Sequence, residues 1–142
     1  ITAAVDVPAT GANGAIIVQG GRFGGWALYV KDGVPAYTYN LLGMRSETVT
    51  SNKPLTAGKH TVRMEFAYAC GGLGKGGGVT LFVDNVKVGE GSLTNTQPMI
   101  FSADETADVG IDLGTPVVEA VGAGEKSRFT GKITQVKIDL KP

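Results

Sequence analysis

The alternation that decides the fold lies in residues 58–68, which read GKHTVRMEFAY. Every second residue from Val62 to Tyr68 is apolar, and the residues between them are mostly polar. An apolar face opposite a polar face, repeating with period two, is typical of a half-buried strand in an antiparallel sheet. The segment therefore predicts a sheet that faces a core on one side and water on the other.

Short runs of the same kind recur along the whole chain and predict about ten strands. They lie at 1–7, 15–18, 26–30, 35–40, 45–50, 58–68, 79–83, 86–89, 98–102 and 129–140. Asp32-Gly33 and Asp84-Asn85 stand where tight hairpins need residues that tolerate positive φ. The 45–50 run is more polar and predicts a strand that lies at an edge or has one face in water. The last run loses its strict alternation, which predicts a β-bulge near Gln135.

The fold class follows from this count of strands. No segment carries a sustained helical stripe, and 22 glycines disfavour helix. Many short strands separated by turns are typical of sandwiches and barrels, so we expect an all-β, antiparallel, two-sheet jelly-roll sandwich. The length of 142 residues fits a single domain over 1–142, in which 104–126 is the least regular stretch.

Composition narrows the classes of partner. Thirteen basic residues balance thirteen acidic ones. This balance argues against nucleic acid and against an anionic membrane surface. The single cysteine excludes an intrachain disulfide and fits a cytoplasmic or a periplasmic protein. The chain opens inside a strand pattern without the regions of a signal peptide, which predicts a domain cut from a longer chain.

Two glycine-rich segments, 19–25 and 71–78, could suggest phosphate binding. A phosphate loop needs a hydroxyl residue after its lysine and then a helix, whereas Lys75 is followed by Gly76 and a strand. We interpret both segments as tight, left-handed connections whose bare backbone allows another surface to approach. The interface or binding candidates that they suggest are Arg22, Phe23, Trp26 and Lys75.

Neither the single histidine nor the single cysteine indicates catalysis. His60 would need a nucleophile and an orienting acid close to it in space, and no Gly-x-Ser-x-Gly motif is present. Cys70 lies ten residues along the same strand, roughly 33 Å away at about 3.3 Å per residue. We therefore expect a structural His60 and a small filler role for Cys70.

An acidic group and an aromatic group each leave two interpretations open. The acidic residues could form a calcium site or could order their loop through Asx turns and backbone hydrogen bonds. They are Asp104, Glu105, Asp108 and Asp112. The aromatic residues could bind sugar rings or could pack in the core and across strands. They are Trp26, Tyr29, Tyr37 and Tyr39.

Several blocks, in order, resemble the C-terminal region of bacterial arylsulfatases. They lie at 19–33, 55–68, 71–77, 81–84, 101–110 and 114–117. Residues 129–138, FTGKITQVKI, are similar to the closing strand of concanavalin A-like and laminin-G-like sandwiches. The two resemblances together cover nearly the whole chain.

The resemblance implies a parent enzyme that hydrolyses sulfate esters. Its nucleophile would be a formylglycine made within a Cys/Ser-x-Pro-x-Arg motif, with a calcium ion held by acidic residues. This chain lacks that motif, because Cys70 is followed by two glycines. No catalytic residue can therefore be transferred to it, and we expect this chain not to be an enzyme.

Three functions follow as expectations. The first is a non-catalytic C-terminal accessory domain that packs against the catalytic domain of a sulfatase in the same polypeptide. The second is a carbohydrate-binding module of a secreted protein, with a glycan as partner, which rests on fold analogy. The third, a hydrolase acting alone, is disfavoured because no nucleophile and base are paired in the sequence.

Overall fold

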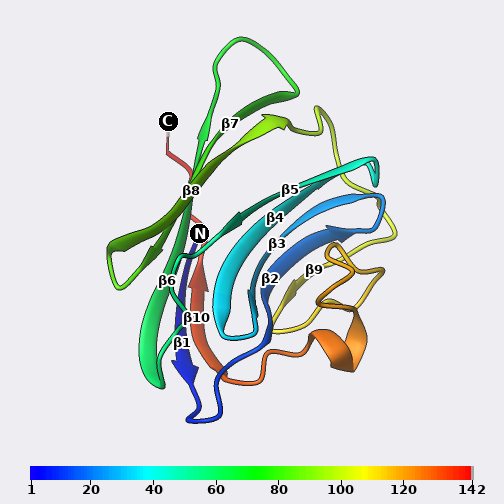
Figure 1. Ribbon diagram of the computed structural model, residues 1–142. Helices are drawn as coiled ribbons and strands as arrows, with labels where there is room; N and C mark the ends of the chain where they lie inside the picture. Colours follow the sequence, from blue (N-terminus) through cyan, green and yellow to red (C-terminus); the bar gives the residue numbers. More distant parts are fainter. Residues whose placement is uncertain (142) are drawn as a thin grey trace.

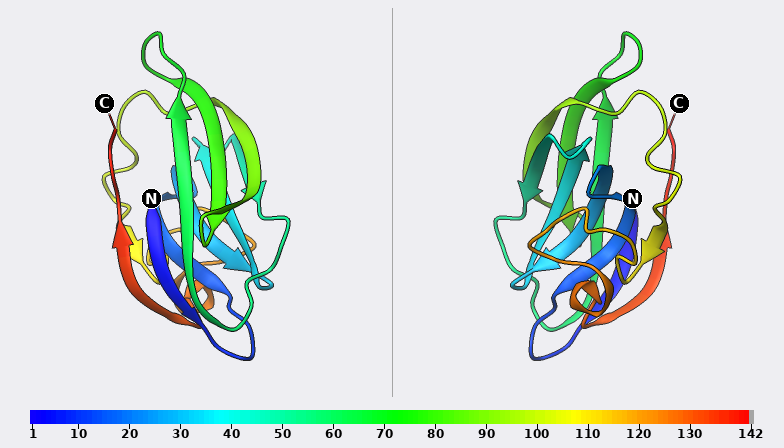
Figure 2. Two further views of the ribbon diagram at one scale, coloured as in Figure 1. Left: turned by 90° about the vertical axis from the view of Figure 1, so that its left-hand side faces the viewer. Right: turned by 90° about the vertical axis from the view of Figure 1, so that its right-hand side faces the viewer.

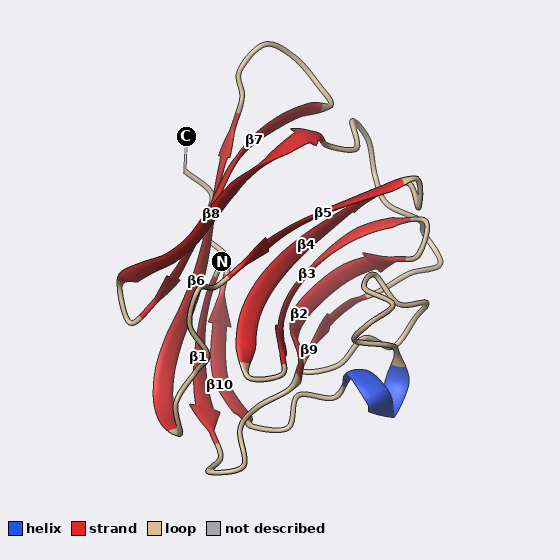
Figure 3. Ribbon diagram, viewed as in Figure 1, coloured by secondary structure: helices blue, strands red, loops and turns tan. Residues whose placement is uncertain are grey.

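The computed structural model describes residues 1–141 and forms two five-stranded antiparallel sheets (Figures 1 and 3). The first sheet has the order β10-β1-β6-β7-β8. Its strands are β1 (Thr2–Val7), β6 (Gly58–Tyr68), β7 (Lys75–Val83), β8 (Val86–Asn95) and β10 (Lys132–Lys137). The second sheet has the order β5-β4-β3-β2-β9. Its strands are β2 (Gly14–Gly21), β3 (Gly24–Lys31), β4 (Val34–Leu41), β5 (Arg45–Thr50) and β9 (Ala107–Val109).

The two sheets pack as a sandwich, and Figure 2 shows their layers from two sides. The main core lies between them, where alternate residues of both sheets point inward. It includes Val5, Val62, Met64, Leu81, Leu28, Val30, Tyr37 and Val49. The predicted all-β, two-sheet antiparallel sandwich is confirmed.

A second, smaller core covers the opposite face of the β2–β5 sheet. Val117, Val118 and Val121, from the segment after β9, pack onto that face. The strand residues beneath them are Ala15, Val18, Ala27, Tyr29 and Ala36. Because β2, β3 and β4 are covered on both sides, their sequences are nearly continuous apolar runs.

The two hairpin turns and the β-bulge that the sequence predicts are present in the structure. Asp32 and Gly33 both have positive φ, as do Asp84 and Asn85, which is the geometry of type I′ hairpins. The consecutive β1 residues Ala4 and Val5 pair with Gln135 and Ile133 of β10. Thr134, which lies between these two partners, is therefore the extra residue of a β-bulge. The bulge expected near Gln135 is therefore confirmed.

Strands β5 and β8, each at the edge of its sheet, meet along one side of the sandwich. The backbone N–H of Asn52 donates to the carbonyl of Val88 at 2.6 Å. Further along, Thr94 donates from its backbone N–H (2.9 Å) and its hydroxyl (2.5 Å) to the Glu47 carboxylate. These contacts close one side of the sandwich.

Two expectations about strands were wrong. Residues 98–102 form no strand and instead belong to the connection from β8 to β9. Phe66 and Tyr68 continue the apolar face of β6 but are exposed. Within 104–126, the stretch expected to be the least regular, residues 107–109 form a short strand on the edge of β2.

The only helix in residues 1–141 is a single 3-10 turn, η1 (Gly124–Ser127). None of the described helical structure is long and apolar enough to cross a membrane.

Candidate functional site

Three segments meet at the end of the sandwich where the β2–β3 and β4–β5 turns lie (Figure 1), and they carry five exposed large apolar side chains. Their exposed fractions are Phe23 69%, Leu42 43%, Met44 76%, Met99 79% and Ile100 78%. They come from the β2–β3 turn, the β4–β5 turn and the connection from β8 to β9. We call these five residues the loop-end surface.

Close contacts bring the three segments together. A Cβ placed on Gly43 would lie 3.6 Å from the Cδ1 of Phe23, so the β4–β5 turn rests against the β2–β3 turn. A Cβ on Gly24 would lie 2.6 Å from Gln97 Oε1 and 3.6 Å from the Phe101 ring. The connection after β8 therefore borders the same turn.

Arg22, which is itself exposed, anchors the β2–β3 turn. Its Nε donates to Glu119 at 2.8 Å, and its backbone N–H donates to the Thr115 hydroxyl at 2.8 Å. Its carbonyl accepts from Asn40 Nδ2 at 2.9 Å. Of the four predicted interface residues, Phe23 thus belongs to the exposed surface, whereas Arg22 anchors the turn that presents it.

Lys75 lies beside this end of the molecule. It opens β7, and its backbone N–H donates to the Tyr68 hydroxyl at 3.0 Å. The preceding loop touches the connection after β8, because a Cβ on Gly74 would be 3.6 Å from Pro98. Leu73, at 76% exposure, extends the apolar surface along this loop.

The glycine-rich segments are only partly the left-handed connections that we expected. Gly20, Gly24, Gly71, Gly72 and Gly74 have positive φ. Gly76, Gly77 and Gly78 instead lie within β7. A Cβ on Gly76 or Gly77 would overlap a carbonyl of the neighbouring strand, so glycine there permits close backbone approach.

The four aromatic residues of β3 and β4 do not form an exposed platform. Trp26 is half-buried, packs against the main core, stacks on Tyr37 with centroids 6.4 Å apart, and donates from Nε1 to Gln19 at 3.1 Å. Tyr29 lies on the opposite face in the smaller core, where its hydroxyl is 3.0 Å from that of Thr38. Trp26 is therefore not part of the loop-end surface.

Tyr37 and Tyr39 share a face, as the alternation of β4 requires, and both are buried. Burial raises the pKa of each hydroxyl above its usual range, and the Gln97 N–H partly offsets this effect on the pKa of Tyr39. The Tyr39 hydroxyl accepts that N–H at 2.7 Å, and its ring lies 6.2 Å from Phe101. Tyr39 thereby holds the connection after β8 onto the core.

Glu105 and Asp108 each accept hydrogen bonds from backbone and hydroxyl groups of their own segment. Glu105 accepts from the Thr115 N–H (3.1 Å) and hydroxyl (2.5 Å). Asp108 accepts from the Leu113 N–H at 3.0 Å and from the Thr106 hydroxyl at 2.6 Å. Loop ordering by backbone hydrogen bonds is thus observed for these two residues, whereas Asp104 is exposed.

Asp112 is the buried member, with 3% exposure. Its Oδ2 accepts from the Val117 N–H at 3.1 Å, whereas its buried Oδ1 has no partner. Burial, reinforced by the charges of Asp108 and Glu105, raises the pKa of Asp112 to about 6, although two backbone N–H groups act in the opposite direction. Within residues 1–141, no three His, Cys, Asp or Glu side chains lie close enough together to hold a metal ion.

His60 has an acid and a hydroxyl beside it, which the sequence did not reveal. Its Nδ1 lies 2.7 Å from Asp84 Oδ2, and its Nε2 lies 2.9 Å from the Thr56 carbonyl and 3.2 Å from the Thr56 hydroxyl. Both ring nitrogens are thus engaged, one by the β7–β8 turn and the other by the turn before β6. The arrangement ties the turn before β6 to the β7–β8 hairpin.

Cys70 lies exposed in the loop after β6 and does not fill a packed site, so the expected filler role was wrong.

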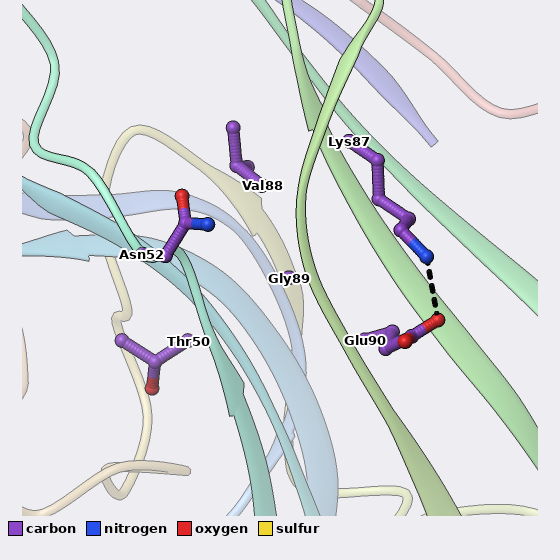
Figure 4. A pocket seen from close by; sticks show the side chains of 6 residues that line it. All are labelled: Thr50, Asn52, Lys87, Val88, Gly89 and Glu90. Carbon is purple, nitrogen blue, oxygen red and sulfur yellow. Dashed lines mark hydrogen bonds and ion pairs between the residues drawn. The ribbon is translucent and has the colours of Figure 1, made fainter.

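A polar hollow of about 330 Å³ lies between the ends of β5 and β8 (Figure 4). Thr50, Asn52 and Glu90 contribute to its lining, and Glu90 is bound to Lys87 at 2.8 Å. This hollow offers hydrogen-bonding groups without an aromatic floor.

Sequence reasoning missed four of the five loop-end residues: Leu42, Met44, Met99 and Ile100. The available signal was the pair of large apolar residues flanking Gly43 in a turn, where polar residues are usual.

Comparisons with protein-family models, with curated proteins and with solved structures find no match for this chain.

Proposed function

We propose that this chain is a non-catalytic accessory domain that packs against another folded protein domain through the loop-end surface. The carrying observation is that five large apolar side chains from three separate segments gather on one end of the molecule. Contiguous exposed apolar patches on soluble domains mark interaction sites. Two of the five are methionines, whose flexible side chains adapt to a partner.

The size of the surface suits a protein partner. With roughly 200 Å² for a fully exposed large side chain, the five residues offer roughly 600–700 Å². This summed area is similar to the roughly 300–600 Å² of the largest patch on a typical monomer, which is often functional. It approaches the roughly 800 Å² that each partner buries in a standard interface.

The resemblance to arylsulfatases supplies the identity of the partner in this proposal. The partner is the catalytic domain of a sulfate-ester hydrolase in the same polypeptide, and this chain is its C-terminal domain with a jelly-roll, concanavalin A-like topology. The resemblance alone supports this choice of partner and topology. In the proposal, none of the residues of this chain takes part in the hydrolysis.

The alternative, a carbohydrate-binding module, receives less support. Trp26 and Tyr29 point to opposite faces of β3, so they cannot form one stacking platform. Affinity electrophoresis in gels that contain polysaccharide tests this alternative directly. Retardation that Trp26→Ala abolishes would favour the glycan reading over the docking proposal.

The first test uses the natural open reading frame. We expect it to encode a Cys/Ser-x-Pro-x-Arg motif upstream of this domain. We then expect hydrogen exchange at 22–24, 42–44 and 97–101 to be slower in the full-length protein than in the 142-residue chain. A frame without that motif would remove the sulfatase assignment, and equal exchange in the two proteins would overturn the docking proposal.

Substitutions locate the interface. Met44→Asp and Ile100→Asp each place a charge in the loop-end surface, so we expect either to restore fast exchange in the full-length protein. Val86→Asp is the matched control, because Val86 is 60% exposed but lies at the β7–β8 turn. An effect of Val86→Asp equal to that of Met44→Asp would contradict the proposed location.

A further inference from the structure

The connection that carries Met99 and Ile100 is fastened at both of its ends. At its start, the Gln97 N–H donates to the buried Tyr39 hydroxyl at 2.7 Å. At its end, the Glu105 carboxylate accepts two hydrogen bonds from Thr115. We call residues 97–105 the clamped loop. The fastening is by side chains, because this loop belongs to neither sheet.

The Glu105 end is built around its carboxylate. A Cβ placed on Gly21 would lie 2.5 Å from the Glu105 carboxylate, and one on Gly114 would overlap Glu105 Oε2. Both glycines have ordinary φ values, so the space they leave, and not a left-handed backbone, is what matters here. Glu105 therefore fills a recess that two missing side chains create.

This recess also reaches the β2–β3 turn. The Thr115 hydroxyl that donates to Glu105 accepts the backbone N–H of Arg22, the neighbour of Phe23. One hydroxyl thus joins the clamped loop to the turn that presents Phe23. Two of the three segments of the loop-end surface thus hydrogen-bond to the same hydroxyl, in addition to their contact at Gly24.

We infer that Glu105 is a positioning residue for the loop-end surface: through Thr115 it sets the clamped loop against the β2–β3 turn, so that Met99, Ile100 and Phe23 are presented together. The inference rests on the proposed docking function for its purpose. Its structural claim, that Glu105 orders the clamped loop, can be measured in this chain without a partner. A loop ordered in advance loses less conformational freedom when it binds.

The test compares Glu105→Ala, Glu105→Gln and Gly114→Ala by hydrogen exchange of the isolated chain. Removing the acceptor or filling the recess should speed exchange of the Arg22 and Glu105 amides, which donate to Thr115 and to Ser102, by about tenfold or more, with β6 and β7 unchanged. Glu105→Gln keeps one acceptor oxygen and should fall between wild type and Glu105→Ala. Gly78→Ala is the control, because a Cβ there meets nothing within 4 Å.

Unchanged exchange of the Arg22 and Glu105 amides in both Glu105→Ala and Gly114→Ala would overturn the inference. If a variant exchanges fast throughout β6 and β7, it has lost global stability and does not report on the loop. The milder Glu105→Gln variant then tests the inference in its place. Docking is scored separately, in the full-length protein. A loop that loosens in Glu105→Ala while Ile100→Asp leaves docking intact would reject the proposed function but keep the positioning role of Glu105.

Discussion

Gly91 of β8 lies directly against Val49 of β5: a Cβ at position 91 would come 2.7 Å from Val49 Cγ2. Two residues earlier, a Cβ on Gly89 would come 2.6 Å from the carbonyl oxygen of Thr50. Both glycines face the other sheet at the side where β5 and β8 meet. The absence of two side chains is what lets these edge strands approach and close the sandwich.

We therefore expect alanine at these positions to destabilise the fold. Gly89→Ala should lower the free energy of unfolding by about 2–3 kcal/mol, because the obstacle is backbone. Gly91→Ala should lower the free energy of unfolding by about 1–2 kcal/mol, since the Val49 side chain can change its rotamer to make room. Urea unfolding measures both. Gly78→Ala again serves as control, and a loss for Gly89→Ala no larger than for Gly78→Ala would contradict this account of the closure.

The ion pair between His60 and Asp84 predicts a change in stability at acid pH. The Thr61 N–H and then the His60 ring hold the pKa of Asp84 below its usual value. A carboxyl with a lowered folded pKa stabilises the fold above its unfolded pKa and loses that effect as pH falls through the folded pKa. Asp84→Asn keeps the left-handed turn but removes the titration.

We expect wild type to exceed Asp84→Asn in stability at pH 5, by less than about 1 kcal/mol because the carboxylate is half exposed. The difference should shrink toward pH 2.5. Asp32→Asn is a matched control, since Asp32 occupies the same place in the other type I′ hairpin and pairs only with Lys31, at 3.7 Å. If Asp32→Asn shows the same pH dependence, the His60 contact is not its cause.

Local patterns in the sequence were sufficient for most of the sandwich. β5 and β6 begin and end where their alternation predicts, and both hairpin turns and the bulge in β10 were anticipated. Each of these features is determined by residues close in sequence: side-chain period, turn residues and a break in register. β5 lies at an edge, which is one of the two positions that its polar composition allowed.

What the sequence did not reveal depends on distant partners. Residues 98–102 contain a short apolar run like that of a buried strand, but Gln97 binds the Tyr39 hydroxyl and Phe101 packs on the core, and within residues 1–141 no strand pairs with this run. β9 is only three residues long and exists because the edge of β2 was free. The surface formed by Phe23, Met44 and Ile100 is likewise a product of chain topology, so the alternation of any one segment could not indicate it.

The acidic segment permits a direct test of calcium binding. Because backbone and hydroxyl donors already occupy Glu105 and Asp108, we expect about 1 mM calcium, in the range that calcium modules require, to leave the melting temperature unchanged relative to EDTA. Magnesium at the same concentration controls for ionic strength. A rise specific to calcium that disappears in Asp112→Asn would instead establish a calcium site at the unpartnered oxygen.

Asp112 should make the fold less stable as pH rises from about 4 to about 6. Its pKa is raised to about 6 in the folded protein, mainly by burial, against about 4 in an unfolded chain. Between these values the unfolded chain releases the proton first, so the folded state binds more protons and loses relative stability as pH increases. Across this pH range, the titration of Asp112 should lower the free energy of unfolding by about 1–3 kcal/mol in total.

Other carboxyls titrate in the same range, so the measurement is the difference in unfolding free energy between wild type and Asp112→Asn from pH 4 to pH 7. We expect wild type to lose stability relative to the variant across this window and to change little above it. Asp104→Asn, at an exposed position of the same acidic segment, should run parallel to wild type. Parallel curves for wild type and Asp112→Asn would mean that solvent or a cation reaches Oδ1 and stabilises the ionised carboxylate.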